Sequence, residues 1–229
     1  MSKKNTNISD KNLPFYEQIP ISYFQQAAKK IGLDSCCDIK EVNDLIQQSD
    51  AILDIGAGWG RVINYLISSG YQGEIFAVER SAQFYNYLKK YENLVSILKG
   101  DIRSVEIKRQ FPLIIWMWGG IAEMNKPEQL KSVQYIISST LANNGYLVID
   151  TAEYINRPPK EVTISAIDTE DRDAIFDVEI ENKHMQYHCY MMSSSQMSEF
   201  ADVLSLKSFF QKKYITDTGV ARVLHIFQK

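Results

Sequence analysis

The middle of the chain alternates short apolar runs with segments in which apolar residues recur at helical spacing. The apolar runs predict strands at 51–56, 74–79, 94–101, 112–118 and 146–151, and the segments between them predict helices at 61–70, 81–91 and 127–141. The run at 112–118 is almost continuously apolar, which is typical of a strand buried on both faces of a sheet. This order of strands and helices predicts an α/β protein with a doubly wound, mostly parallel, Rossmann-like sheet.

The pattern changes after Tyr154. Alternating segments at 162–167, 174–180 and 184–192 predict a small antiparallel flap inserted after the fifth strand, and a helix follows at 194–204. Two further strands, 208–216 and 221–227, are joined by the tight turn Asp-Thr-Gly. We therefore expect an antiparallel hairpin at one edge, which brings the main sheet to seven strands.

The N-terminal part of the chain is different again. Residues 1–12 are polar and are expected to be loose, 13–33 show a helical pattern after Pro20, and 39–48 predict a short helix. The whole chain of 229 residues is interpreted as one domain. Its parts are an N-terminal cap (1–48), a ligand-binding core (49–154), a substrate flap (155–192) and a C-terminal helix with the hairpin (193–229).

Composition narrows the function classes. Hydrophobic residues make up 45% and charged residues 23%, as in ordinary soluble globular proteins. A net charge of −3 disfavours nucleic acid as a partner, because phosphate binding requires a positive field. No apolar run approaches the roughly 18 residues of a membrane span, so a cytoplasmic protein is expected. Three cysteines, two of them adjacent, show neither a disulfide framework nor a zinc spacing, and no metal is expected.

The segment Ala-Ile-Leu-Asp-Ile-Gly-Ala-Gly-Trp-Gly carries the first chemical signal. An apolar run stops at Asp54, and Gly56, Gly58 and Gly60 follow at alternate positions before a helix. Such a turn lets backbone N–H groups and a helix N-terminus approach a ligand closely. The alternative interpretation is a tight turn that needs glycine only for its backbone conformation, and the glycines alone do not decide between the two.

Acidic residues follow the next two strands. Glu79 ends the second strand, where an acid can accept both hydroxyls of a ribose, and Asp101 follows the third, where a carboxylate can accept from the amine of a base. Ile102 would flank the purine ring. A dinucleotide fingerprint requires a glycine at the position of Arg61, and Asp54 would repel a pyrophosphate. A ligand with a sulfonium and an ammonium group, such as S-adenosylmethionine, fits better.

With these residues the sequence resembles the class I S-adenosylmethionine-dependent methyltransferases over about residues 49–229. The resemblance rests on Asp-Ile-Gly-Ala-Gly-Trp-Gly at 54–60, on Glu79, on Gly-Asp-Ile at 100–102, on the fourth strand ending Trp-Met-Trp-Gly-Gly, and on the terminal hairpin. It implies S-adenosylmethionine as cofactor, bound by Asp54, Gly56, Ala57, Gly58, Gly60, Glu79, Arg80, Asp101, Ile102, Met117 and Trp118. In this family Asp54 would bind the ammonium group, the glycines the amino-acid end, Glu79 the ribose and Asp101 the adenine amine.

The fourth strand lacks the Asn-Pro-Pro-Tyr type of signature of amino-methylating nucleic-acid enzymes. Residues 116–124 are instead similar to the corresponding segment of small-molecule N-methyltransferases of the glycine and amino-sugar type. The expected function is therefore methyl transfer to a small molecule, at nitrogen. The alternatives are a methyltransferase acting on protein or RNA, an NAD(P)-dependent oxidoreductase, and a cofactor-binding protein without activity. The oligomeric state stays open.

Four residues are candidates for binding the acceptor: Tyr16, Tyr23, Trp118 and His188. Each has a plainer interpretation, namely aromatic packing for the first three and a surface position for the histidine. Since strand residues alternate, only one face of the strand containing Trp116 and Trp118 is expected to meet the pocket. Glu123 is interpreted as a solvated acid, although it could bind an amine. Methyl transfer requires no diagnostic acid or base, and no catalytic residue is assigned.

Overall fold

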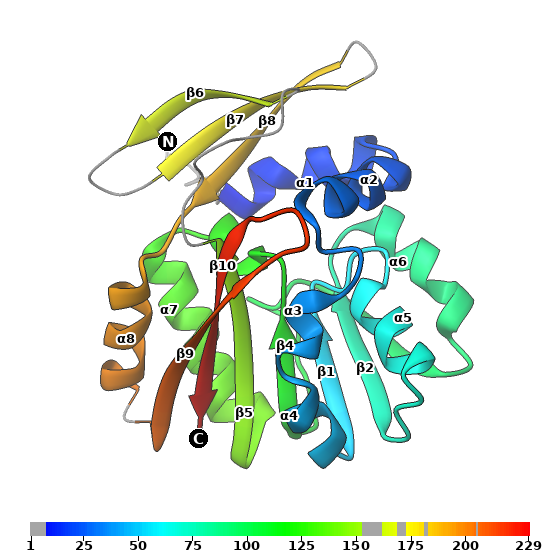
Figure 1. Cartoon of the computed structure of the whole chain (residues 1–229), viewed down its shortest axis with the longest axis vertical. Coiled ribbons are helices and arrows are strands. Elements are labelled where there is room, and N and C mark those ends of the chain that lie inside the picture. The colour runs from blue at the N-terminus through cyan, green and yellow to red at the C-terminus, as the bar shows by residue number, and fades with distance from the viewer. Residues whose placement is uncertain (1–7, 153–161, 169–172, 181–182, 205) are drawn as a thin grey trace, which may run out of the picture.

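The computed structural model describes residues 8–152, 162–168, 173–180, 183–204 and 206–229, and its centre is a seven-stranded sheet (Figure 1). The strand order is β3-β2-β1-β4-β5-β10-β9. The strands are β1 (Ala51–Ile55), β2 (Glu74–Glu79), β3 (Val95–Lys99), β4 (Phe111–Trp116), β5 (Leu141–Ala152), β9 (Ser208–Ile215) and β10 (Ala221–Gln228). β1 to β5 run parallel, and β10 pairs antiparallel with both β5 and β9. The predicted Rossmann-like sheet and its terminal hairpin are confirmed.

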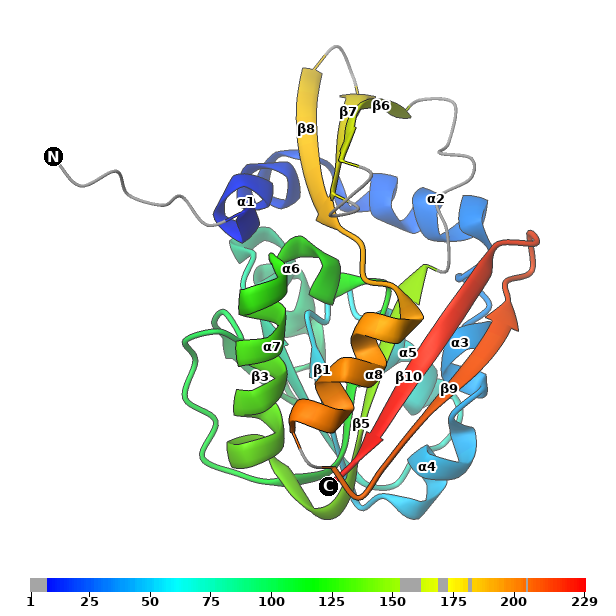
Figure 2. The ribbon, with the colours of Figure 1, turned by 90° about the vertical axis from the view of Figure 1, so that its left-hand side faces the viewer.

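Helices cover both faces of this sheet, as Figure 2 shows from the side. α7 (Lys126–Tyr135) and α8 (Ser194–Val203) pack on one face, while α3 (Cys37–Lys40), α4 (Asn43–Gln48) and α5 (Arg61–Ser68) pack on the other. α6 (Ala82–Leu88) follows β2. All five residues of β1 are buried, as a central strand between two helical layers requires.

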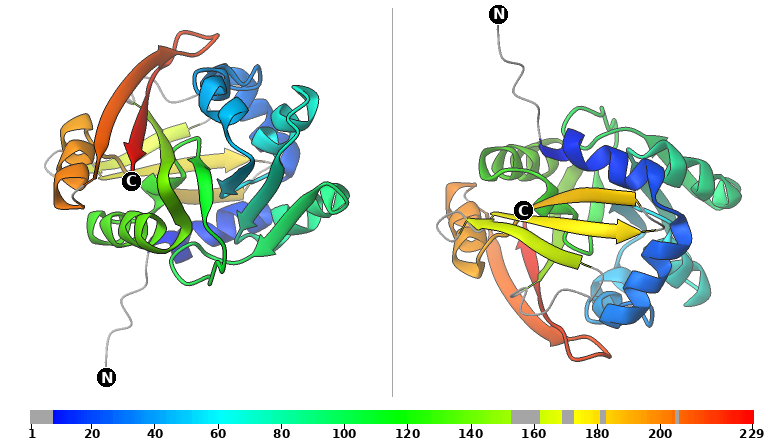
Figure 3. Two further views of the ribbon diagram at one scale, coloured as in Figure 1. Left: turned by 90° about the horizontal axis from the view of Figure 1, so that it is seen from below. Right: turned by 90° about the horizontal axis from the view of Figure 1, so that it is seen from above.

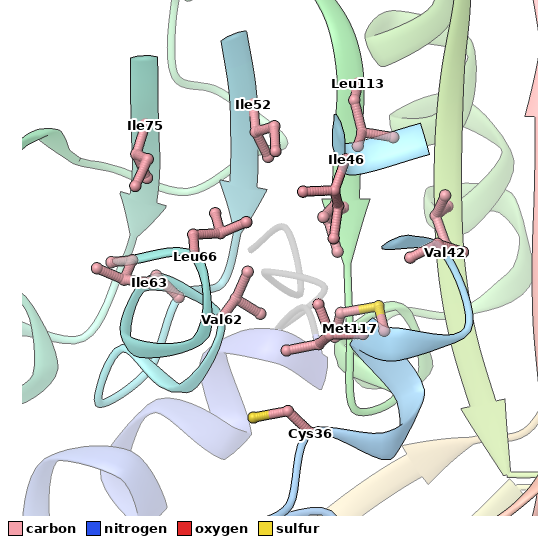
Figure 4. Packing of buried hydrophobic residues seen from close by; sticks show 14 of the residues in the cluster. Cys36, Val42, Ile46, Ile52, Val62, Ile63, Leu66, Ile75, Leu113 and Met117 are labelled. Carbon is pink, nitrogen blue, oxygen red and sulfur yellow. The ribbon is translucent and has the colours of Figure 1, made fainter. Parts of the chain in front are cut away.

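The two cores follow from the alternation of side chains along the strands. Ile52 of β1 points toward α5 and lies in a cluster with Val62 and Leu66, together with Ile46 of α4 (Figure 4). Leu53, its neighbour in sequence, belongs to the opposite cluster. Because successive strand residues face opposite sides, one apolar run supplies both cores and fixes where the strand ends must lie.

A second, three-stranded antiparallel sheet forms the predicted flap. It consists of β6 (Val162–Asp168), β7 (Asp173–Ile180) and β8 (Lys183–Tyr190). With α1 (Ile8–Gln18) and α2 (Ile21–Ile31), it covers one end of the main sheet, as the view from above in Figure 3 shows. Phe15 and Phe24 pack there against Phe84 and Phe176, so cap, core and flap share one apolar cluster.

Two expectations for the N-terminal region are wrong. Residues 1–7, which were also expected to be loose, lie outside the described residues, but residues 8–12 belong to helix α1, and Asn12 is fully buried. Its side chain donates to the His188 carbonyl and accepts from the His188 N–H, both at 2.8 Å, so it pairs with the β8 backbone like a neighbouring strand. The single helix expected at 39–48 is broken into α3 and α4.

Asn-Asn-Gly at 143–145 is a sequence that predicts a turn before the fifth strand, but the structure places these residues inside β5. Phe111 pairs with Leu141, but Leu113 pairs with Tyr146, so the residues between form a bulge, with Asn144 at a φ of 61°. The helix predicted at 127–141 begins at Lys126, capped by Asn125, and its last part is a π-helical turn, η3 (Ile136–Thr140).

Candidate active site

A cavity of about 1350 Å³ lies at the carboxyl ends of β1, β2 and β4, beneath the cap and the flap. Ten of the eleven residues expected to bind the cofactor line it: Asp54, Gly56, Ala57, Gly58, Glu79, Arg80, Asp101, Ile102, Met117 and Trp118. Small-molecule sites are typically ~300–1,000 Å³, so this cavity has room for two molecules side by side. The fold therefore brings together residues that are up to 64 positions apart in sequence, from Asp54 to Trp118.

The glycine turn has two different functions within one motif. Gly56 and Gly58 adopt positive φ of 66° and 56°, and a Cβ atom built on either would meet no atom closer than 3.9 Å. Side chains at these two positions would extend into the cavity. A Cβ at Gly60 would instead lie 2.9 Å from the Tyr91 ring. Gly60 is therefore needed for packing against the chain after α6. It was expected to bind the cofactor, but it does not line the cavity.

Asp54, the last residue but one of β1, carries a buried carboxyl group with only 1% of its surface exposed. Its Oδ2 atom has no hydrogen-bond partner among the described residues. Burial raises the pKa of Asp54 to about 8, and the nearby Glu79 carboxylate adds to this, while Arg61 opposes it. A buried acceptor without a donor, at the wall of a cavity, fits a ligand that brings a cationic hydrogen-bond donor.

Arg61 does not neutralise Asp54 by direct contact. Its guanidinium donates to both carboxylate oxygens of Asp38 and, at 3.0 Å, to the Leu33 carbonyl. Asp38 is fully buried. This ion pair fixes α3 to the first turn of α5, and the arginine that replaces the third glycine of a dinucleotide motif thus holds the N-terminal segment in place.

Glu79 connects the ends of two strands. Its Oε2 accepts from the Gly58 N–H at 2.8 Å, and its Oε1 accepts from the Ser81 N–H at 2.7 Å. Burial raises the pKa of Glu79 to about 7, although these two N–H groups favour the charged form. Each carboxylate oxygen keeps a further lone pair, so a ribose hydroxyl can still donate to it. The sequence showed only the acid at the strand end and not its second function in shaping the glycine turn.

Asp101 is held by arginines. Arg103 donates to it through its backbone N–H at 3.0 Å and through its guanidinium, and Arg80 lies 3.8 Å away. Burial raises the pKa of Asp101, but the hydrogen bonds and charges of the arginines outweigh this and bring it below the ordinary value. Asp101 is therefore a carboxylate at neutral pH, placed where it can accept from an amine.

Glu123 is not the solvated acid that we expected from the sequence. It lines the cavity with 13% of its side chain exposed, at the end of the 3-10 turn η2 (Gly120–Glu123). Arg80 donates to one of its oxygens and the Tyr16 hydroxyl to the other, and Tyr16 also lies 3.3 Å from the Tyr187 hydroxyl. Glu123 comes shortly after a tightly turning Gly-Gly pair. No periodic pattern of apolar residues runs through this turn, so the sequence does not predict that Glu123 is buried.

These groups form a polar cluster of Tyr16, Arg80, Glu123 and Tyr187 between the cap, the core and the flap. Burial raises the pKa of Glu123, and burial together with the Glu123 charge raises the pKa of both tyrosines well above their ordinary value. The tyrosines are therefore neutral donors at physiological pH, and Glu123 is the group in the cluster able to take up a proton.

The end of β4 turns sharply, so that Trp116, Met117 and Trp118 all line the cavity. The expectation that only one face of this strand meets the pocket is wrong, because Trp118 has a φ of 52° and leaves the strand geometry. Met117 is buried beside Val62 and Cys36 (Figure 4), and the Trp118 ring contacts the Trp59 ring edge to face at 5.2 Å. Trp59 lies inside the glycine motif, where no spacing or periodic pattern singles it out.

Of the four residues expected at the acceptor end, three line the cavity: Tyr16, Tyr23 and Trp118. His188 does not, because Tyr187 and Cys189 on either side of it face the cavity and strand residues alternate. Among the described residues, no group of three or more His, Cys, Asp or Glu side chains is arranged to hold a metal ion. Cys36, Cys37 and Cys189 are not joined in a disulfide. In the described part of the chain no helix has the length and apolar character to span a membrane.

Solved structures share this arrangement of strands and helices. CalS10, an amino pentose methyltransferase from Micromonospora echinaspora, solved with bound S-adenosylmethionine, matches with a TM-score of 0.64 over 93% of this chain and 99% of its own, at 12% identity. The chain has a methyltransferase fold. An S-adenosylmethionine-dependent methyltransferase from Clostridium acetobutylicum matches with a TM-score of 0.63 over 95% of both chains, at 14% identity. The glycopeptide N-methyltransferase MtfA, in complex with sinefungin, matches with a TM-score of 0.63 over 83% of this chain and 85% of its own, at 14% identity.

No family model and no curated protein matches this chain. Because the identities to these solved structures are only 12–16%, the matches show a shared fold. A shared fold does not determine the activity, which depends on the residues of the site.

Proposed function

We propose that the chain is an S-adenosylmethionine-dependent methyltransferase whose acceptor is a small molecule, methylated at nitrogen. The observation that carries the proposal is the unpartnered, buried carboxylate of Asp54 beside two glycines that leave the cavity open. The ammonium group of an amino-acid end fits this site because it supplies the hydrogen-bond donor that Asp54 Oδ2 lacks, whereas a pyrophosphate offers only acceptors. The structures that share the fold, several of them methyltransferases, support the same cofactor.

The other cofactor contacts follow from the geometry. Gly56 and Gly58 would give backbone approach to the amino-acid end, Glu79 would accept from the ribose, and Asp101 with Ile102 would hold the adenine. The bound cofactor would supply a methyl group already activated by a sulfonium, so the chain needs only to bind, orient and keep water out. A glycine turn, a cap and a flap that close one cavity are suited to these tasks.

The acceptor is proposed to be an amine because of the polar cluster around Glu123. An amine attacks only in its neutral form, and the proton that it carries in water must go to an acceptor. Glu123 is the cluster member with that capacity, and its neighbours Tyr16 and Tyr187 are neutral donors. The rest of the surroundings is aromatic, with Trp59 and Trp118 on one side and Phe176 on the flap. A compact amine with an apolar or ring-shaped body suits these walls.

Titration calorimetry tests the cofactor directly. The purified chain is titrated with S-adenosylhomocysteine, with NAD⁺ and NADP⁺ in parallel. We expect micromolar binding of S-adenosylhomocysteine alone. Binding of a dinucleotide instead would replace the proposal with an oxidoreductase, and the glycine turn would then be a pyrophosphate site.

The acceptor is tested with a labelled methyl donor. Primary and secondary amines, alcohols, a peptide mixture and RNA are offered in separate reactions. Label transfer to amines supports the proposal, and transfer only to peptide or RNA would contradict the small-molecule acceptor.

A further inference from the structure

Trp118 has an unusual backbone. Its φ of 52° and the φ of 68° at Gly119 place two successive residues in the left-handed region, directly after β4. This conformation is unfavourable for a bulky side chain such as tryptophan, because its Cβ crowds the backbone. Strain of this kind persists only where neighbouring groups impose it, and it is concentrated at functional sites.

One residue of β5 accepts hydrogen bonds from both strained positions. The Trp118 N–H donates to Asp150 Oδ2 at 2.9 Å, and the Gly119 N–H donates to the Asp150 backbone carbonyl at 3.0 Å. These two N–H groups belong to the peptide planes on either side of the Trp118 Cα, so holding both of them fixes the φ and ψ of Trp118. Asp150 therefore stabilises the left-handed pair through its side chain and its main chain together.

The Asp150 carboxylate is itself held in place from the terminal hairpin. Arg222 of β10 donates to Oδ2 at 2.6 Å and to Oδ1 at 3.1 Å, and the Tyr214 hydroxyl of β9 donates to Oδ1 at 2.8 Å. Asp150 is fully buried and Arg222 is 5% exposed. A charge-assisted, multiply bonded pair in the interior has one geometry, so the carboxylate cannot rotate away from Trp118.

The conformation of Trp118 determines where its indole lies. The ring contacts the Trp59 ring at a centroid distance of 5.2 Å and an angle of 86°. Trp59 follows Gly58, whose N–H is bonded to Glu79. The glycine turn is thus fixed at two points, by Glu79 from β2 and by the indole of Trp118 from β4.

We infer that Asp150 is a positioning residue for the cofactor site: with Arg222 and Tyr214 it holds Trp118 in a left-handed conformation, so that the indole supports the glycine turn through Trp59. The inference rests on the proposed function for its ligand but not for its geometry. It gives the hairpin at the sheet edge a function in the site, although Tyr214 does not line the cavity.

The test uses the full chain and two readouts. The first is the near-ultraviolet circular dichroism of the tryptophans, in which Trp59→Phe identifies the contribution of the ring pair. The second is calorimetric affinity for S-adenosylhomocysteine. The variants are Asp150→Asn, Tyr214→Phe and Trp118→Gly. Glycine is chosen at position 118 because it adopts a positive φ without strain and removes the indole. The matched control is His225→Gln, which alters a buried polar contact to Thr151 between the same two strands.

Trp59→Phe lacks the part of the dichroism that comes from the Trp59–Trp118 ring pair. We expect Asp150→Asn to lose the same part, and Tyr214→Phe to lose it to a smaller extent. The affinity of Asp150→Asn should fall about tenfold, or about 1.4 kcal/mol. In the Trp118→Gly background, Asp150→Asn should have no further effect on affinity, while His225→Gln should leave both readouts as in the wild type.

An unchanged spectrum and affinity in folded Asp150→Asn would overturn the inference, as would an equal loss of affinity in the Trp118→Gly background. If Asp150→Asn does not fold, Tyr214→Phe decides on the same two readouts. If the wild-type chain does not bind S-adenosylhomocysteine, the proposed function fails, and the dichroism alone still tests the position of Trp118.

Discussion

The Glu79 carboxylate accepts a hydrogen bond from the Gly58 N–H at 2.8 Å, and this bond joins the ends of β1 and β2 at the candidate cofactor site. Glu79→Ala removes both this bond and the proposed ribose contact. We expect the affinity for S-adenosylhomocysteine to fall by about 1–3 kcal/mol, the range for a lost buried hydrogen-bond partner. Calorimetry at constant pH measures the change. A loss of only about a few tenths of a kcal/mol in binding free energy would mean that the ribose does not bind at Glu79.

Gly58→Val places a branched side chain in the cavity at a positive φ. Binding of S-adenosylhomocysteine should be abolished, because the side chain occupies the space that the ligand needs. Gly70→Val is the matched control: Gly70 has a φ of 74°, its Cβ would also meet nothing within 4 Å, and it lies outside the cavity. Both variants carry similar backbone strain, so a comparable loss of thermal stability is expected in both, and loss of binding in the first alone. Retained binding in Gly58→Val would refute the function assigned to this turn.

Asp54 links binding to pH. Its pKa of about 8 in the folded chain lies above the ordinary 3.8, so the folded protein keeps a proton that the unfolded chain releases. The free energy of unfolding of the ligand-free protein therefore falls as the pH rises from 4 to 8. Asp54→Asn should remove this contribution and stabilise the ligand-free chain at pH 8 by at least about 1 kcal/mol, measured by urea unfolding.

The same substitution should abolish binding of the cationic ligand, whereas Asp50→Asn, in an exposed acid four residues earlier, should leave binding unchanged. In the wild type, affinity for S-adenosylhomocysteine should rise between pH 6 and 8, because the ligand requires the carboxylate. Affinity independent of pH over this interval would mean that Asp54 does not bind the cation.

His225 contributes the opposite pH dependence. It is fully buried, and burial lowers its pKa to about 4 from the ordinary 6.5. Between these two values the unfolded chain binds a proton that the folded chain does not, so the free energy of unfolding falls as the pH drops from 6.5 to 4. His225→Gln should flatten this part of the stability profile. The difference between the stability profiles of the wild type and His225→Gln gives the contribution of His225 alone, because Asp54 is the same in both. Parallel profiles would show that the pKa of His225 is not lowered in the folded chain.

Glu123→Gln tests the acceptor end. The variant keeps the shape of the side chain but cannot take up a proton, so methylation of an amine acceptor should lose about tenfold in kcat/KM, at the low end for general base catalysis. Affinity for S-adenosylhomocysteine should change by less than about threefold, because Glu79 and Asp54 are unaffected. Glu41→Gln, in an acid paired with Lys212 on the surface, is the control. Undiminished amine methylation would remove Glu123 from the reaction.

The arrangement of strands and helices in this protein follows from its amino-acid sequence. Apolar runs such as 51–56 must be buried on both faces, and the helices between them must cover the sheet, so a doubly wound, mostly parallel sheet with a ligand site at its carboxyl ends follows from the local pattern. The glycines and acids at those strand ends then fall into one cavity. For this reason Asp54, Gly56, Gly58, Glu79 and Asp101 could be named without a structure.

Which polar groups are partners became visible in the folded chain alone, because partners come from segments that are far apart in sequence. Asn12 pairs with the backbone of β8, Glu123 is buried between Tyr16 and Arg80, and Asp150 holds Trp118 from another strand. None of these contacts has a period or a fixed spacing in sequence. They arise from the requirement that each buried polar group finds a partner in the folded chain. Asp54 Oδ2 is one of the buried side-chain atoms that lack a hydrogen-bond partner among the described residues, and because it lies at the cavity wall its missing partner points to a ligand.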